Sequence, residues 1–195
     1  MPFDYYDRLS RSQQAIYRLS DQRGRLPLAR ADELRLLVEA LEKALEAEKT
    51  AGVQQAAGRL CREICKRLDT EPVSVRVLAR RPSSAASELH GLYEREPGRR
   101  PRLTVWMRTA QHVRVVKFKT FLRTLLHEMV HHLDYSLLGL EDSFHTQGFF
   151  RRESHLVAQL LGPERESDSE REKKKEPALA AARPGRRKPV QLKLF

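Results

Sequence analysis

The sequence has only two cysteines in 195 residues, Cys61 and Cys65. They are one helical turn apart, on a predicted apolar face that also carries Leu60, Ile64 and Leu68. We interpret both as small buried hydrophobic residues of a protein in a reducing compartment. A cysteine metal site is disfavoured because it would need a second cysteine pair, which the sequence lacks.

Long apolar runs are also missing. No stretch approaches the roughly 18 consecutive apolar residues that a membrane-spanning helix needs. The first residues, Met1-Pro2-Phe3-Asp4, do not show the basic-then-apolar order of a signal peptide. These two absences predict a cytoplasmic protein with no membrane partner.

Acidic residues are too few to balance the basic ones. The chain has 37 Lys and Arg against 26 Asp and Glu, which gives a formal net charge of +11. Such an excess favours a polyanionic partner such as DNA, although charge alone does not identify the polyanion. The densest clusters of basic residues in the part expected to fold are predicted to contact phosphates. The alternative is that they are surface charges that only keep the protein in solution. These nucleic-acid-binding candidates are Arg80, Arg81, Arg99, Arg100 and Arg102.

The apolar pattern divides the chain into three regions. Residues 1–70 show helical periodicity throughout, with a first helix capped by Asp4 and two more over about 31–48 and 51–68. From Val73 the period changes to two, which predicts strands over about 73–77, 88–93 and 102–108.

The predicted fold class is therefore α+β. We expect a helical N-terminal region (1–70) and a core (71–162) in which a small three-stranded sheet packs on a central helix and a following helix. That last helix is expected to stop at Gly162-Pro163. Residues 163–195 have few apolar side chains to bury, which predicts a disordered, basic C-terminal tail.

The central helix, predicted over residues 118–135, contains the run His127-Glu128-Met129-Val130-His131. At about 100° per residue, His127 and His131 are roughly 40° apart around the helix axis, so both imidazoles can reach one cation. Glu128 is about a quarter turn away, close enough to touch a metal-bound water without being a ligand. In this zincin arrangement zinc activates the water and polarises a carbonyl, while the glutamate transfers the proton. The pattern predicts peptide hydrolysis with one Zn²⁺ ion.

A catalytic zinc needs a third protein ligand and an open position. His145 is the predicted third ligand, because it stands at the entrance to the last helix, which must pack back on the central one. The alternatives are Glu141, Asp142, Glu153 and His155. Nearby, His132 is expected either in the hydrophobic core or in contact with a metal ligand, without binding the metal itself. Asp134 and Tyr135 are expected to orient a ligand, to stabilise an oxyanion or to face solvent.

The strand Leu103 to Met107 comes shortly before the central helix. We expect it to be the sheet edge beside the cleft, because an unpaired edge can hold an extended peptide by main-chain hydrogen bonds. Val105 and Trp106 are therefore the predicted substrate-binding residues. The alternative for Trp106 is a buried core aromatic.

The string Leu125 to His131, the strand before it and the later His-then-Phe element together resemble the SprT-like zinc metalloproteases. The resemblance covers about residues 73–161. It departs at the third histidine, which in that family is usually followed directly by glycine, whereas here Thr146 and Gln147 precede Gly148. The resemblance implies a zinc-dependent protease that degrades proteins at DNA, including DNA-protein crosslinks. By matching positions it implies His127, His131 and His145 as ligands and Glu128 as general base.

Residues 191–195 are Gln191-Leu192-Lys193-Leu194-Phe195. Exposed apolar residues on a polar tether gain nothing from water unless a partner binds them. The pentapeptide resembles the bacterial sliding-clamp-binding motif, with contacts from Gln191, Leu192, Leu194 and Phe195. Lys193 stands where a small or acidic residue is usual. The alternative is that the terminus folds back onto the domain.

Taken together, these patterns predict a cytoplasmic, nucleoid-associated zinc metalloendopeptidase that acts on DNA-bound proteins. Its basic surface and the clamp peptide would raise its concentration at replication sites. Two alternatives remain. One is a DNA-associated or clamp-associated scaffold with a structural metal site, and the other is a regulatory protease that cleaves one dedicated protein.

Overall fold

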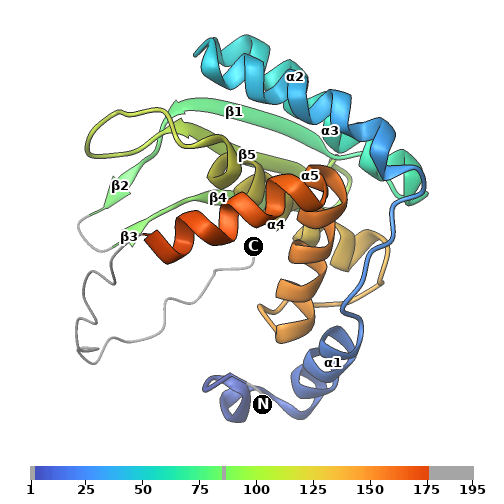
Figure 1. The fold of residues 1–195 in the computed structure, drawn as a ribbon. Coiled ribbons are helices and arrows are strands. Elements are labelled where there is room, and N and C mark those ends of the chain that lie inside the picture. The colour runs from blue at the N-terminus through green and yellow to red at the C-terminus, as the bar shows by residue number, and fades with distance from the viewer. Residues whose placement is uncertain (1–2, 85–86, 176–195) are drawn as a thin grey trace.

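The computed structural model describes residues 3–84 and 87–175. Within these residues, helices and a small sheet form an α+β fold, as the sequence predicts (Figure 1). The helices are α1 (Arg11–Gln22), α2 (Arg35–Glu46), α3 (Thr50–Arg67), α4 (Phe118–Ser136) and α5 (Gln147–Lys175), with short 3-10 helices η1 (Tyr6–Arg8) and η2 (Ala31–Leu34). The strands are β1 (Ser74–Arg80), β2 (Ser83–Ser84), β3 (Ser87–Glu88), β4 (Gly91–Glu94) and β5 (Arg102–Arg108).

The main sheet has the order β1-β5-β4, with β5 parallel to β1 and antiparallel to β4. The prediction that Leu103 to Met107 forms the sheet edge is therefore wrong, because β5 is hydrogen-bonded on both sides. Val105 is fully buried and Trp106 is 6% exposed, so neither residue is available to a substrate. Their predicted role in substrate binding is therefore wrong, and Trp106 is a buried aromatic. The edge strand beside α4 is β4.

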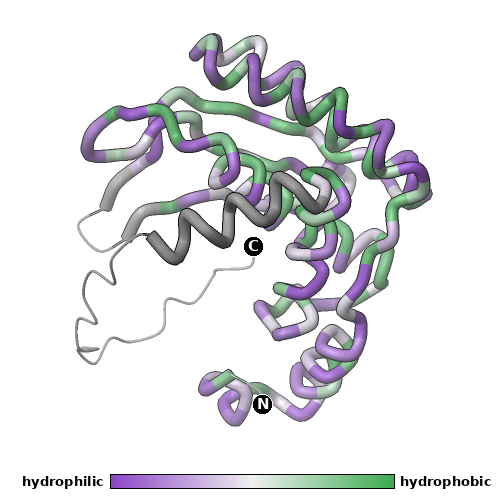
Figure 2. The backbone as a smooth tube through the Cα atoms, in the orientation of Figure 1, coloured by the Kyte–Doolittle hydropathy of each residue, from purple (hydrophilic) through white to green (hydrophobic). Residues whose placement is uncertain are grey.

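One hydrophobic core joins the two predicted folded regions. The helices α2 and α3, the sheet and the helices α4 and α5 all contribute buried side chains to the same cluster, among them Leu41, Leu60, Val105, Leu125 and Leu156. Figure 2 shows hydrophobic residues along the strands and in alternation with hydrophilic ones along α2 and α3. The helices α2 and α3 of the predicted N-terminal region therefore share one core with the sheet, α4 and α5. Cys61 and Cys65 are buried and unpaired, which confirms their interpretation as small core residues.

The first helix begins later than the sequence suggested. Ser10 caps α1, and its side chain and that of Gln13 form a reciprocal capping box. The predicted cap at Asp4 is wrong, since Asp4 lies in a turn before η1. The last helix breaks at Gly162, where φ is 76° and ψ is 168°, which confirms the break expected at Gly162-Pro163.

Helical structure extends beyond the predicted start of the tail at residue 163. After the break at Gly162, helical backbone continues to Lys175, whereas the sequence placed disorder from residue 163. The clamp-motif residues 191–195 lie outside the described residues. Among the helices in the described ranges, none combines the length and the apolar character that spanning a membrane requires.

Candidate metal centre

The candidate centre is built on α4, whose sequence has neither glycine nor proline between Phe118 and Ser136. The apolar stripe of the helix, Phe121, Leu125, Met129 and Leu133, is buried in the core. The side chains of His127 and His131 lie toward the segment before α5 and are only partly buried. The periodicity of α4 therefore separates a packing face from a histidine face, as the sequence predicts.

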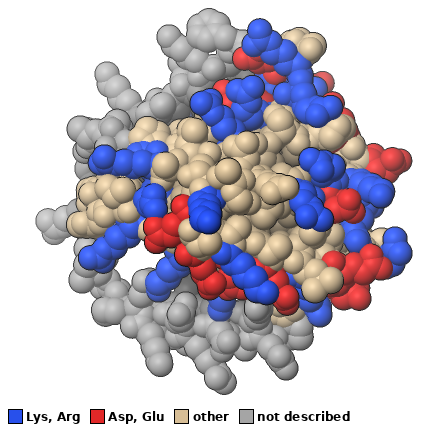
Figure 3. Space-filling view, turned by 90° about the horizontal axis from the view of Figure 1, so that it is seen from above, with Lys and Arg blue, Asp and Glu red and all other residues tan. Residues whose placement is uncertain are grey.

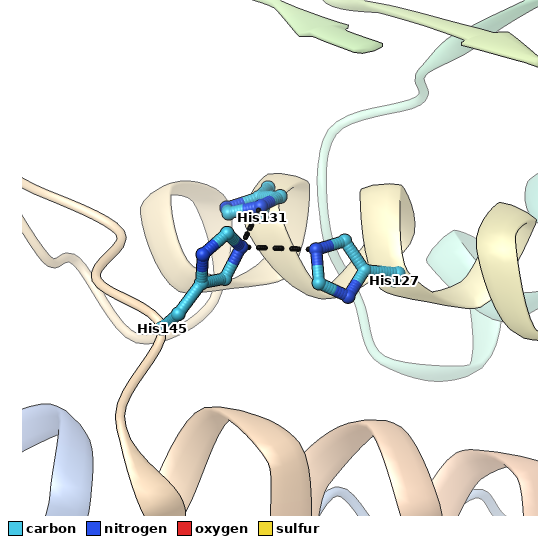
Figure 4. A group of neighbouring side chains, drawn as sticks. All are labelled: His127, His131 and His145. Atoms are coloured by element: carbon cyan, nitrogen blue, oxygen red, sulfur yellow. Dashed lines mark hydrogen bonds between the residues drawn. The ribbon is translucent and has the colours of Figure 1, made fainter. Parts of the chain in front are cut away.

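The three predicted ligands come together (Figure 4). The Nε2 atom of His145 lies 2.9 Å from Nε2 of His127 and 3.1 Å from Nε2 of His131. One ligand atom from each ring lies within 4.8 Å of the other two. Nitrogens around a tetrahedral ion with bonds of about 2.0–2.1 Å are separated by roughly 3.3 Å, close to the two distances from His145. These three histidines could therefore hold one metal ion.

Burial keeps two of the rings in the form that binds metal. Desolvation, with help from the neighbouring histidines, lowers the pKa of His131 far below its usual 6.5. The same causes lower the pKa of His145 to about 4. Both imidazoles are thus neutral at pH 7, and a neutral ring nitrogen is what a metal ion requires.

The Nδ1 atoms of the two histidines on α4 each contact a supporting side chain. Nδ1 of His127 lies 2.9 Å from Oε2 of Glu153. Nδ1 of His131 lies 2.7 Å from Oγ of Ser143, which itself donates a hydrogen bond of 2.8 Å to Oδ2 of Asp134. The Ser143 hydroxyl already donates its hydrogen to Asp134, so it can only accept a hydrogen bond from His131, and the Glu153 carboxylate likewise accepts one from His127. Both rings therefore carry their proton on Nδ1. Each Nε2 is left with a lone pair for the ion.

These contacts decide between the alternatives left open by the sequence. Glu153 is not the third ligand but the partner of His127. Nδ1 of His155 accepts a hydrogen bond from the backbone N–H of Leu26, outside the histidine cluster. Within the described residues, the three histidines are the group whose ligand atoms gather closely enough to hold an ion, and Glu141 and Asp142 do not belong to it.

Behind His131 lies a buried ion pair. Nη2 of Arg152 is 2.9 Å from Oδ1 of Asp134, and both side chains are 0% exposed. Burial raises the pKa of Asp134 to about 6, although Arg152 opposes the shift. Of the roles left open for Asp134, the structure therefore supports the orienting one. The contribution of Arg152 and of Ser143 was not anticipated from the sequence.

A signal for the buried positions of Arg152 and Glu153 on α5 was present in the sequence. Positions 149, 152, 153, 156 and 160 share one face of α5 at helical spacing, and the apolar members Phe149, Leu156 and Leu160 are buried. Charged residues at 152 and 153 therefore interrupt an apolar stripe. A charged pair in such a stripe indicates a buried polar network.

Glu128 lies beside the histidines and is only 7% exposed. Burial raises the pKa of its carboxyl to about 7, with a smaller raising effect from Glu153 and an opposing effect from His127. Its neighbour is Gly91 of the edge strand β4, where an added Cβ atom would lie 2.3 Å from Oε1 of Glu128. The carboxylate thus occupies space that exists only because residue 91 is glycine.

Tyr93, two residues further along β4, also faces the centre. Its ring is stacked 6.5 Å from that of His131 and 5.8 Å from that of Tyr135. Its hydroxyl lies 3.3 Å from Nδ1 of His132, whose Nε2 lies 2.9 Å from the carbonyl oxygen of Glu71. His132 is 0% exposed, which confirms the expected core position. Burial raises the pKa of Tyr93, so its hydroxyl stays protonated.

The predicted phosphate contacts do not form one surface. Arg81 is 6% exposed and packs inside the fold, so its assignment to a phosphate contact is wrong. Arg80 donates two hydrogen bonds to the carbonyl oxygen of Ala110. It lies opposite Arg108, six residues along β5 from Arg102 and thus about 20 Å away. Arg99, Arg100 and Arg102 are exposed at the other end of the sheet.

The hydrogen bond from His131 to Ser143 yields a first prediction. Replacing Ser143 with alanine should weaken Zn²⁺ binding by about tenfold or more, because the ring loses the acceptor that orients it. Competition with a chromophoric chelator measures the affinity. Ser154→Ala, on the exposed side of α5, is the matched control. Equal affinities for the two variants would show that Ser143 does not orient the ring.

The site thus combines two ligands from α4, one from the segment before α5, supporting side chains from α4, α5 and that segment, and an edge strand. Comparison with protein-family models, with curated proteins and with solved structures found no match for this chain. The function is therefore inferred from the geometry of the residues themselves.

Proposed function

We propose that the chain is a zinc-dependent metallopeptidase. The observation that carries this proposal is the convergence of three imidazole nitrogens on one point beside the buried carboxyl group of Glu128. Imidazole ligands favour zinc among the ions that support hydrolysis at neutral pH. Three protein ligands, rather than four, leave a position open for a reactant, which is typical of catalytic and not of structural zinc sites.

The roles of the side chains follow from their contacts. A zinc ion in this site supplies a Lewis acid and an activated water. Glu128, whose pKa is raised to about 7, accepts a proton at its carboxylate and delivers it to the leaving amine. Glu153 and Ser143 hold the rings of His127 and His131 in one orientation throughout. The stacked ring of Tyr93 closes one side of the site.

The edge strand β4 is the proposed substrate platform, in place of β5. One side of β4 pairs with β5, and its other side is not part of the sheet formed by the described residues. An extended peptide can pair with such an edge through main-chain hydrogen bonds. Because Gly91 is in contact with Glu128, this edge runs directly past the proposed base. Recognition by main-chain groups predicts little dependence on substrate sequence.

Replacing Gly91 with alanine tests this arrangement. The new methyl group must displace the Glu128 carboxylate, so hydrolysis should fall by about 10²-fold or more while Zn²⁺ still binds. Steady-state cleavage of an unstructured protein measures the loss. Gly58→Ala is the control, because a Cβ atom there meets nothing within 4 Å. Full activity of the Gly91 variant would place the base elsewhere.

Proteins bound to DNA are the proposed substrates. The net charge of +11 and the exposed arginines 99, 100 and 102 support an interaction with phosphates. Figure 3 shows that on the face seen from above, basic side chains are spread out with acidic ones between them. Such a distribution favours weak, sequence-independent contact, and the peptide 191–195 is proposed to add recruitment by the sliding clamp. The protein would then work at the nucleoid.

Recruitment by the sliding clamp can be tested separately from catalysis. Deleting residues 191–195 should abolish retention by an immobilised bacterial sliding clamp, because the motif supplies both the glutamine and the apolar anchors. A pull-down with the full chain and the deleted chain measures it. The deletion should leave cleavage of a free protein unchanged, and equal recovery of both chains would rule out clamp binding through this peptide.

The experiment for the whole proposal is cleavage of a protein crosslinked to DNA, compared with the same protein free in solution. Zinc-dependent cleavage that is faster on DNA is expected. Cleavage at the same rate with and without DNA would favour a regulatory protease with one dedicated protein substrate. A chain that binds one zinc ion but cleaves nothing would favour a scaffold.

A further inference from the structure

The segment that carries His145 is held by the N-terminal part of the chain. The Tyr5 hydroxyl donates a hydrogen bond of 3.1 Å to the carbonyl oxygen of His145 itself. The hydroxyl groups of Ser20 and Thr146 are 3.2 Å apart and buried. The backbone N–H of Gly148 donates a bond of 2.7 Å to Oδ1 of Asp21. Three contacts thus link the N-terminal segment to residues 145–148, which are 126 to 140 positions further along the chain.

The backbones of the two segments also touch. A Cβ atom at residue 148 would lie 2.3 Å from the carbonyl oxygen of Ser20 and 2.7 Å from Cα of Asp21. Only glycine permits such an approach of α5 to α1, and Figure 1 shows the two helices side by side. Thr146 meanwhile accepts a hydrogen bond of 3.0 Å from the backbone N–H of Phe149. The start of α5, and with it His145, is therefore fixed against α1.

Arg152 extends the connection to a second ligand. It donates hydrogen bonds of 2.7 Å to the carbonyl oxygen and 2.9 Å to the hydroxyl of Ser20. The same guanidinium pairs with Asp134, which accepts a bond from the Ser143 hydroxyl behind His131. The end of α1 is thus linked through buried polar groups to both histidines.

The third ligand needs such support more than the other two. His127 and His131 are positioned by the geometry of one helix. His145 belongs to a segment between Leu137 and Thr146 that has no regular helix or strand. Its position relative to the other rings must come from tertiary contacts, and tenths of an ångström matter for metal binding.

We propose that residues 5–21 are a positioning element of the metal centre, which holds His145 at the distance that a shared ion requires. This inference rests on the proposed metal centre and assigns a role to the helical segment that the resemblance to the SprT-like family does not cover. Tyr5, Ser20 and Asp21 are positioning residues, because they act on the ion only through His145 and its neighbours.

The test uses the full chain with Asp21→Ala. Loss of the bond to Gly148 should weaken Zn²⁺ binding by about tenfold or more and shift the Co²⁺ absorption spectrum toward that of His145→Ala. Asp21→Asn should recover most of the affinity, because its amide oxygen still accepts the bond. Gln22→Ala, the exposed next residue, should match the wild-type chain. Tyr5→Phe, which removes one hydroxyl, should cost about threefold.

The outcomes separate this inference from the proposed function. Wild-type affinity and spectrum in Asp21→Ala and Tyr5→Phe would overturn it and leave the metal centre standing. A loss of affinity of equal size in Gln22→Ala, or one that Asp21→Asn does not recover, would also overturn it. A wild-type chain that binds no metal would instead remove the centre itself. Thermal unfolding of each metal-free variant shows whether the fold is intact, and an intact Asp21→Ala with weakened zinc binding supports the inference.

Discussion

Replacing Glu128 with glutamine is expected to reduce peptide hydrolysis by about 10²- to 10⁴-fold while one zinc ion stays bound. The amide is nearly isosteric with the carboxyl group, so it fits the space beside Gly91. It has no site that accepts a proton at neutral pH. The three imidazoles are untouched, since Glu128 does not belong to the histidine cluster.

Two measurements on one preparation decide this prediction. Zinc content reports the site, and the cleavage rate of a DNA-bound protein reports the chemistry. Glu141→Gln is the matched control, because Glu141 is an exposed glutamate near the third ligand. The control should retain both zinc and activity. Undiminished cleavage by Glu128→Gln would mean that another group is the base, and loss of zinc would mean that Glu128 supports the ion.

Replacing Arg152 with methionine is expected to destabilise the metal-free fold by about 3 to 5 kcal/mol at pH 8. That is the usual effect of removing one partner from a buried ion pair, because the other charge is left uncompensated. Here the remaining partner is Asp134, which is 0% exposed. A stability of roughly 5–15 kcal/mol is typical of a domain, so a loss of this size is large.

The loss of stability in the Arg152→Met variant should be larger at high pH than at low pH. Burial raises the pKa of Asp134 to about 6 even with Arg152 present, and removing that cation raises the pKa further. A raised carboxyl pKa means that the folded state binds more protons than the unfolded state. Stability therefore falls as the pH rises from about 4 through the folded pKa. The variant should accordingly lose less stability at pH 5, where Asp134 is protonated, than at pH 8.

Urea denaturation of the metal-free protein at the two pH values measures both effects. Arg151→Met is the matched control, because Arg151 is the exposed neighbour of Arg152 and donates its hydrogen bond one turn back, to Gln147. It should change the free energy of unfolding by less than about 0.5 kcal/mol. A loss in the Arg152 variant that is equal at both pH values would mean that Asp134 is not the group left uncompensated.

The parts predicted well from the sequence depend on local spacing. The span of α4 and its separation into a histidine face and an apolar face follow from helical periodicity. The expectation that His145 lies close to His127 and His131 followed from the number of ligands that zinc needs and from the expected packing of α5 on α4, and the three rings do come together. The break at Gly162 followed from the Gly-Pro pair.

The parts that were missed depend on contacts between distant segments. The strand Leu103 to Met107 was expected at an edge, yet its nearly continuous apolar run is typical of a strand covered on both faces. All five of its residues are buried in the centre of the sheet. Arg81 looked like a surface cation because its burial depends on the packing of other segments. The contacts of Ser20 and Asp21 with the third-ligand segment are invisible until the chain is folded.

The most direct measurement is the metal content and coordination of the full chain prepared with excess zinc, by elemental analysis and X-ray absorption. We predict one zinc ion per chain with three imidazole nitrogens at about 2.0–2.1 Å and one exchangeable oxygen ligand. The His145→Ala variant should lose one nitrogen from that shell. A wild-type chain that retains no stoichiometric zinc, or one whose zinc shell lacks the three imidazoles, would contradict the proposed metal centre.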